Sequence, residues 1–379
     1  MLILISRIID MKKKYIALLC ACLVIGLLIW GISQRPKTVP ETEPEETITP
    51  SEPEPEPEPV PEPEKGPWDD YALNKLTGEY DLDKEMDGFR PVAIVINNIT
   101  LSLPQRGINT CDVLLEIEVE GGITRTMAFY ADYRKITEAG SVRSLRNQFL
   151  DLARPIDAMI IHVGSSAFAT DSLNAYGYKT LDAMGSSIVK QDRSRLGKYG
   201  SEHTWFTNSE LIESCISTLK MRTEDNSPEP VFHFADYGTE AVVDDGVATE
   251  ASWAFSDDYD SEIKYDESTG TYTLSQHGKA RTDELDGEQF SFSNVFVLVA
   301  SRPDYYGAGV PRYDFSAGGT GYYLCRGKYE SFSWTKDSAS SRMVFTDSNG
   351  KELTVNPGRS YIAIVNTKQA DTISLTDNS

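Results

Sequence analysis

The stretch that decides the fold of the first half of the chain runs from Leu114 to Tyr130 and reads LLEIEVEGGITRTMAFY. Apolar and acidic residues alternate from Glu116 to Glu120, which is the period of a β-strand. A Gly-Gly pair between two β-prone runs is typical of a two-residue hairpin loop, because both loop positions require positive φ. We therefore predict a β-hairpin with Gly121 and Gly122 as its loop.

The register of this hairpin assigns its side chains to faces. With a two-residue loop, Glu118 lies opposite Arg125, so one face carries Glu116, Glu118, Glu120 and Arg125. Carboxylates side by side can divide acid and base roles when their surroundings separate their pKa values. The alternative is a solvated strand face with weak cross-strand ion pairs. We predict ligand binding at this face and assign no catalytic residue.

Composition limits the classes of partner. The chain has 379 residues and a formal charge of −22, which suits two domains with accessory segments. Such acidity argues against nucleic acid as a partner. Outside the N-terminal apolar segment, Cys111, Cys215 and Cys325 are scattered, which leaves one disulfide or buried free thiols as alternatives. No cofactor and no metal site is predicted, and the oligomeric state stays open.

The N-terminus predicts attachment to the cell membrane. Lysines 12–14 precede the uncharged apolar run 15–33, which is long enough to cross a bilayer with the domains on the extracytoplasmic face. The alternative is a lipoprotein signal that ends at a lipidated Cys22. Both alternatives place the protein outside the cytoplasm. The following segment, 34–65, is rich in Pro and Glu and is predicted to be a disordered linker.

The remaining chain predicts an α+β fold. Residues 66–227 mix strands with helices and form a predicted mixed α/β domain, and 228–366 form a predicted β-rich domain followed by a polar tail over 367–379. Strands are expected over 91–96 and 158–163. Helices are expected from Ser141 to about Ala153, over 167–176 and over 208–219. Aromatic residues of the second domain are expected in its core, with a sugar-stacking or peptide-stacking surface as the alternative.

Two arginines near the predicted helix start suggest an anion site. Arg143 and Arg146 are three residues apart, so both can point the same way. The alternative is that they pair with the hairpin glutamates. We predict that they converge with Arg125, Glu120 and His162 at one concave site.

His162 and three further residues complete the candidate ligand-binding set. His162 and Ser165 flank a small-residue turn at the carboxyl end of a predicted strand, where α/β sheets bind ligands. A buried histidine bonded to a backbone carbonyl is the alternative for His162. His203 lies in a polar loop, and Asn98 follows the strand over 91–96.

Several short motifs resemble those of the YerB-like family of bacterial lipoproteins. They are Arg90-Pro91-Val92-Ala93, Glu120-Gly121-Gly122-Ile123-Thr124-Arg125, Ser141-Val142-Arg143-Ser144-Leu145-Arg146 and Glu202-His203-Thr204-Trp205-Phe206-Thr207. The resemblance covers roughly residues 89–365 and implies a two-part extracytoplasmic protein of the cell envelope, without implying a reaction. The expected function is binding of an anionic or cell-wall-derived ligand by the first domain. The alternative is an envelope hydrolase or transferase that uses the hairpin carboxylates.

Overall fold

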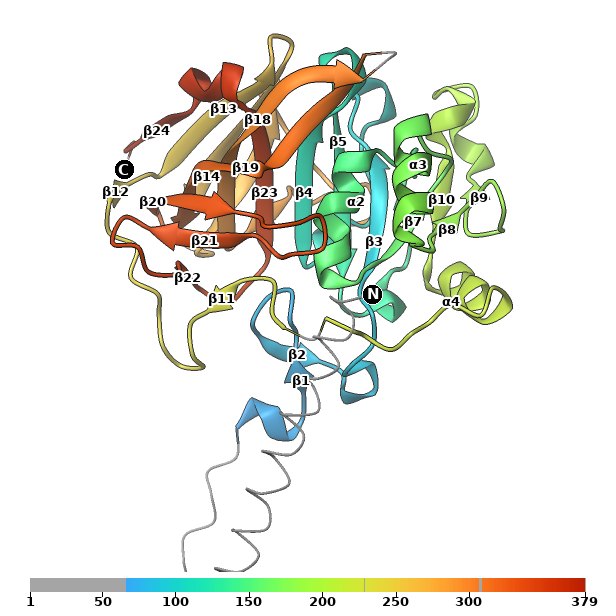
Figure 1. Ribbon diagram of the computed structural model, residues 1–379, viewed down its shortest axis with the longest axis horizontal. Helices are drawn as coiled ribbons and strands as arrows, with labels where there is room; N and C mark the ends of the chain where they lie inside the picture. Colours follow the sequence, from blue (N-terminus) through green and yellow to red (C-terminus); the bar gives the residue numbers. More distant parts are fainter. Residues whose placement is uncertain (1–65, 228, 307–308, 379) are drawn as a thin grey trace, which may run out of the picture. The chain divides into compact units, whose positions relative to one another are not determined.

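The computed structural model describes residues 66–227, 229–306 and 309–378 (Figure 1). The predicted membrane anchor or lipoprotein signal and the predicted linker lie outside these residues. Within the described ranges, no helix has the length and apolar character needed to cross a membrane.

One central sheet runs through both halves of the sequence (Figure 1). Its strand order is β12-β20-β19-β18-β23-β4-β5-β3-β7-β8, with β21 paired to β20. The first half contributes β3 (Val92–Asn97), β4 (Val113–Glu118), β5 (Thr124–Tyr130), β7 (Met159–His162) and β8 (Leu181–Asp182). The second half contributes β12 (Gly246–Val247), β18 (Asn294–Tyr306), β19 (Val310–Cys325), β20 (Lys328–Thr335), β21 (Val344–Asp347) and β23 (Ser360–Asn366). The two halves meet where β23 pairs in parallel with β4, so they share a backbone ladder.

A second sheet covers one face of the central sheet near β23. Its strands are β13 (Glu250–Ser256), β14 (Tyr259–Asp266), β15 (Thr271–Gln276), β16 (Lys279–Ala280), β17 (Ser291–Phe292) and β24 (Ser374–Thr376). Trp253 and Phe292 pack against Tyr361 of β23, with ring centroids 6.0 and 5.5 Å apart. Residues 367–376, predicted only as part of a polar tail, form the 3-10 helix η11 (Thr367–Thr372) and β24, which pairs with β13.

Helices cover the other face of the central sheet. Figure 1 shows α2 (Asn147–Ala153) and α3 (Ala167–Tyr176) lying in front of the strands of the first half. The third helix of the described residues is α4 (Ser209–Thr218), capped by Asn208. Small strand pairings complete the fold: β1 (Ala72–Leu73) with β2 (Tyr80–Leu82), β6 (Ala139–Gly140) and β9 (Lys190–Gln191) with β10 (Trp205–Thr207), and β11 (His233–Phe234) with β22 (Thr354–Val355).

The mixed sheets and few helices agree with the predicted α+β class, and the helices predicted over 167–176 and 208–219 are present. The helix predicted from Ser141 is wrong in its start, because α2 begins at Asn147. The backbone of Arg143 donates to the carbonyl of Val95, 2.8 Å away, and Val142 forms a bridge with Ile96. Residues 141–146 are extended because their backbone groups pair with neighbouring segments instead of with a helical turn.

The predicted hairpin exists, but its predicted register is wrong. Glu118 lies opposite Thr124, and Ile117 lies opposite Arg125. Gly121 and Gly122 both have positive φ, as expected, but they belong to a longer turn in which Val119 donates to Ile123 over 2.7 Å. A one-residue shift moves a side chain to the other face of a sheet. Arg125 therefore lies on the face opposite to Glu116 and Glu118.

The core accounts for the cysteines and most of the aromatic residues. Cys111, Cys215 and Cys325 are buried free thiols. The core prediction is confirmed for four of these aromatic residues, which are buried: Trp253, Phe255, Tyr323 and Trp334. Tyr305 is an exception, because it is 50% exposed. Some of these rings, such as Trp253, join the two sheets, whereas Phe296 packs against Tyr323 and Phe345 on the central sheet itself.

Candidate functional site

Three arginines gather at the turn end of the β4–β5 hairpin, on the helix face of the central sheet. Arg125 comes from β5, Arg146 is the residue before α2, and Arg143 lies in the extended segment beside β3. Arg125 and Arg146 both donate from Nη1 to the carbonyl of Ser144, at 2.7 and 3.3 Å. We call these three residues the arginine cluster.

Only part of the positive charge of the arginine cluster is balanced. Arg146 forms an ion pair with Glu120, with 2.5 Å between Nε and Oε1. Arg143 donates from Nη1 to the backbone carbonyl of Glu202, 3.0 Å away. Among the described residues, no carboxylate lies within 4 Å of the guanidinium group of Arg125 or Arg143. The cluster therefore has more cations than directly paired anions.

Arg125 is the most unusual member, because it is only 6% exposed. Within the described part of the chain, the buried Nε atoms of Arg125 and Arg143 have no hydrogen-bond partner. Burial lowers the pKa of Arg125, the neighbouring Arg146 and Arg143 lower it further, and Glu120 opposes this shift. Burial also lowers the pKa of Arg143. A desolvated guanidinium without a counter-ion is costly, and an anion would satisfy both the charge and the free N–H groups.

His203 borders the arginine cluster through Glu202. The amide nitrogen of Asn97 donates to Nδ1 of His203 over 2.8 Å, and Nε2 lies 3.5 Å from Oε1 of Glu202. Burial lowers the pKa of His203, and the nearby Arg143 adds to that effect. Sequence reasoning missed Asn97 as a supporting residue. The sequence signal was the polar pair Asn97-Asn98 directly after the apolar run 91–96, and only the structure shows that Asn97 is the cross-strand partner of Arg125.

The structure corrects the predicted inclusion of His162 in this site. Its side chain is 1% exposed, and its Nδ1 and Nε2 atoms lie 2.8 Å from the carbonyl of Gly164 and from Oγ1 of Thr180. Both ring nitrogens are therefore used internally, which was the alternative for this residue. Ser165 pairs with Thr170 through their hydroxyl groups, 2.7 Å apart.

Glu116 and Asn98 are also separate from the arginine cluster, in a buried network between the two sheets. Oε1 of Glu116 accepts from Asn98 at 2.8 Å, from Thr124 at 2.6 Å and from Gln276 at 2.8 Å. Its Oε2 accepts from the hydroxyl of Tyr361 at 2.7 Å. Glu116 is thus buried and bonded within the protein, which differs both from the predicted ligand contact and from the solvated alternative for this carboxylate.

Glu118 has a similar internal role. Its carboxylate pairs with Arg302 at 2.7 Å and accepts from Asn366 at 3.3 Å. Burial raises the pKa of Glu118, while Arg302 opposes the shift. Of the predicted hairpin glutamates, only Glu120 is left to contact the arginine cluster. The described residues contain no group of three or more His, Cys, Asp or Glu side chains placed to hold a metal ion.

Fold and site together define a two-part protein with a shared central sheet and a partly unbalanced cluster of buried cations. Comparisons with known proteins agree with the two-part organisation. Residues 76–222 match the N-terminal domain, and residues 251–362 the C-terminal domain, of a protein family of unknown function, DUF3048. The chain belongs to the YerB-like family.

The YerB protein of Bacillus subtilis illustrates the similarity both in sequence and in structure. The chain is 29% identical over 301 residues to "Putative lipoprotein YerB" of Bacillus subtilis strain 168, covering 75% of this chain and 84% of the relative. The crystal structure of the YerB protein from Bacillus subtilis has the same fold, with a TM-score of 0.70 at 24% identity. That match covers 81% of this chain and all of the other.

Proposed function

We propose that this protein is anchored on the outer face of the cell membrane and binds an anionic, cell-wall-derived ligand at the arginine cluster. The observation that carries the proposal is Arg125, a buried cation whose Nε has no partner within the described residues and whose nearest charged neighbours include two further arginines. Planar guanidinium groups suit carboxylate and phosphate, since two parallel N–H groups can bind two oxygens.

The alternative, a hydrolase or transferase that uses the hairpin carboxylates, has less support. General acid and base groups must reach a substrate. Glu116 and Glu118 are 1% and 3% exposed, and each accepts hydrogen bonds from the protein. Their contacts favour a structural role.

Arg143 offers the sharpest test, because it is only half-buried and its side chain donates to a backbone carbonyl instead of a carboxylate. Arg143→Lys keeps the charge and removes the planar fork. We expect the full chain carrying this variant to bind inorganic phosphate or purified cell-wall fragments at least fivefold more weakly in calorimetric titration, with an unchanged melting temperature. Arg326→Lys, on the surface of the second half, is the matched control.

A purely structural arginine cluster predicts the opposite pattern. Arg143→Lys would then be silent in binding, and Arg143→Ala would chiefly lower the melting temperature. That result, or the absence of measurable binding to either probe by the unaltered chain, would count against an anion site.

The proposed location rests on the charge pattern before residue 66 and on the relative named as a lipoprotein. Protease added to intact protoplasts is expected to digest the domains and to leave a small membrane-held stub. Full protection of the C-terminal half would exclude this topology. Mass spectrometry of the stub separates a lipidated Cys22 from an intact helix.

A further inference from the structure

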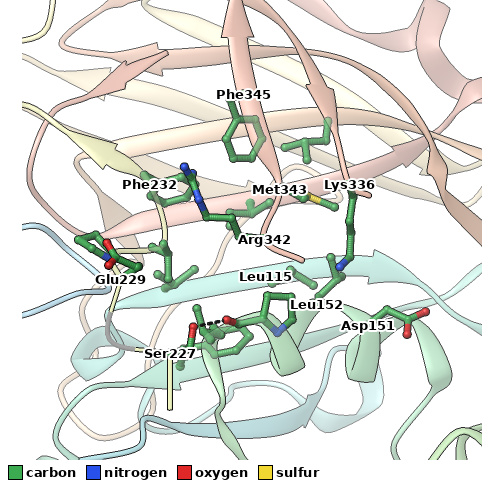
Figure 2. A pocket seen from close by; sticks show the side chains of 18 of the residues that line it. Leu115, Asp151, Leu152, Ser227, Glu229, Phe232, Lys336, Arg342, Met343 and Phe345 are labelled. Atoms are coloured by element: carbon green, nitrogen blue, oxygen red, sulfur yellow. Dashed lines mark hydrogen bonds between the residues drawn. The ribbon is translucent and has the colours of Figure 1, made fainter. Parts of the chain in front are cut away.

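An apolar cavity, here called the sheet-face cavity, lies on the helix face of the central sheet, away from the arginine cluster. Its floor is formed by side chains of β4, β5, β18 and β23, including Leu115 and Ile362. Its walls come from α2 and the turn after it, from Ser227 and residues 229–232, and from Lys336, Arg342, Met343 and Phe345. Figure 2 shows Met343 and Phe345 on one side of this space and Leu115 and Leu152 on the other.

Most of the lining of the sheet-face cavity is apolar, and its polar members are Asp151, Ser227, Glu229, Lys336 and Arg342. The cavity contains about 770 Å³ of space between atoms, including space open to solvent, but the centres of water-sized molecules can occupy only about 100 Å³. The small volume open to water-sized molecules favours a single alkyl chain over a bulky ring system. Unfilled apolar space also forfeits packing contacts, so an apolar occupant would stabilise the protein.

Charged groups lie at two ends of the sheet-face cavity. Lys336 reaches toward Leu152 at one end, whereas Glu229 lies at the opposite end (Figure 2). Arg342 also lines the cavity, and its guanidinium group forms an ion pair with Glu352 over 2.7 Å. The ammonium of Lys336, a residue only 4% exposed, donates to the carbonyls of Ser338 and Ser341 at 2.7 and 2.6 Å. An ammonium has three N–H groups. One N–H of Lys336 is therefore left without a hydrogen-bond partner among the described residues and can bind a ligand.

Asp151 does not occupy that remaining position. No ion pair within 4 Å joins Lys336 to any carboxylate of the described residues, and the Asp151 carboxylate points away from the cavity (Figure 2). Burial lowers the pKa of Lys336 to about 8, with Asp151 opposing the shift and Arg154 adding to it. Lys336 is thus mainly charged at neutral pH and has no direct counter-ion among these residues.

We propose that the sheet-face cavity binds the alkyl chain of an amphiphile and that Lys336 holds the anionic head group of that molecule. The chain would lie between Leu152 and Met343 along the floor of the sheet. The head group would sit at the lysine end, because Arg342 is already paired with Glu352 and Glu229 repels an anion from the other end. A free fatty acid and an acyl chain of an anionic membrane lipid share this chemistry. The inference is independent of the arginine cluster, with which the cavity shares no residue.

Photo-crosslinking in membranes tests the proposal on the full chain. One arm uses a fatty acid with a diazirine on its alkyl chain, and a second arm uses a phosphatidylglycerol with the same group on one acyl chain. Mass spectrometry is expected to locate the label on the cavity-lining segments, 151–156 or 336–345, in at least one arm. The arm that labels them identifies the source of the chain. Labelling confined to other segments in both arms would overturn the proposal.

Filling the sheet-face cavity provides a matched pair of variants. Met343→Trp is expected to reduce labelling of these segments at least fivefold, whereas Met184→Trp, at a residue that is 76% exposed, leaves it unchanged. Leu152→Trp fills the cavity from the other wall and replaces Met343→Trp if that variant does not fold. Unchanged labelling in a folded, filled variant would overturn the proposal.

The role of Lys336 is tested through the charge of the probe. Lys336→Gln is expected to weaken labelling by the fatty acid at least fivefold while labelling by the matching diazirine alcohol stays the same. Lys351→Gln, on an exposed turn, is the control. Equal labelling by the fatty acid in the Lys336→Gln variant and the unaltered chain would overturn the assignment of the head group to this lysine.

Discussion

The side-chain amide of Gln276 donates a 2.8 Å hydrogen bond to Oε1 of Glu116, which joins β15 of the second sheet to β4 of the central sheet. Arg281, a buried cation, donates to Gln276 and also to Gln105 at 2.6 Å. The negative charge of Glu116 opposes the lowering of the pKa of Arg281 by burial. One network of buried polar groups therefore holds the two sheets in register.

Glu116→Gln is expected to lower the free energy of unfolding by about 3 kcal/mol, because it leaves Arg281 without the opposing charge and sets an amide donor against other donors. Urea denaturation of the full chain measures the change. Glu262→Gln, on the exposed face of β14, is the control and should have little effect. A loss below about 1 kcal/mol for Glu116→Gln would show that the network contributes little.

The buried pair of Glu118 and Arg302 should behave as a coupled unit. Glu118→Gln and Arg302→Gln are each expected to destabilise the protein by about 3 kcal/mol, because each leaves a buried partner unpaired. The double variant should lose less stability than the sum of the losses in the two single variants, with a coupling energy of about 1–3 kcal/mol. The exposed pair of Lys264 and Glu250, 2.8 Å apart, is the control cycle, and no measurable coupling is expected there. Additive effects at Glu118 and Arg302 would contradict this expectation.

Gly319 of β19 is expected to tolerate no larger residue. A Cβ atom there would lie 2.1 Å from the carbonyl oxygen of Val299 and 2.8 Å from the ring of Trp334. Gly319→Ala should therefore cost about 2–3 kcal/mol in urea denaturation, since a packed sheet must shift to admit the methyl group. Gly185→Ala is the matched control, because nothing lies within 4 Å of a Cβ atom at that position. Equal stability of the two variants would show that the strands around Gly319 move apart easily.

Asp151 predicts a specific pH dependence of stability. Burial raises its pKa to about 6, and the nearby Lys336 and Arg154 only partly oppose this shift. The folded state thus holds the proton more tightly than the unfolded state, so this group favours folding below about pH 4 and loses that contribution as pH rises toward 6. The Asp151→Asn variant has no carboxyl group at this position, so its stability does not fall with rising pH for this reason.

The free energy of unfolding of the variant, relative to that of the unaltered chain, should therefore rise by about 1–2 kcal/mol as pH increases from 4 to 7. Urea denaturation at both pH values measures the gain, and Asp171→Asn on exposed α3 controls for removal of an acidic group. A constant difference between the Asp151→Asn variant and the unaltered chain would contradict the shift.

The secondary structure was largely predictable where local pattern decides it. Alternation and the Gly-Gly pair predicted both strands of the hairpin, and Ser166 and Asn208 now cap α3 and α4 as their residue types favour. The start of α2 was not predictable from its apolar spacing. Extended residues 141–146 obtain their hydrogen bonds from segments distant in the sequence, such as β3, and local propensity carries no information about those partners.

The sequence by itself determined that Glu116, Glu118 and Arg125 would lie on the two strands of the β4–β5 hairpin, because the pattern of each strand is local. Only the tertiary structure decided which of them meet. A turn longer than two residues moved Arg125 to the helix face, where Arg143 and Arg146 lie, and left Glu116 and Glu118 facing the second sheet. Side chains alternate across a strand, so a shift of one residue in register exchanges the two faces, and packing against distant strands and helices then sets the environment of each charge.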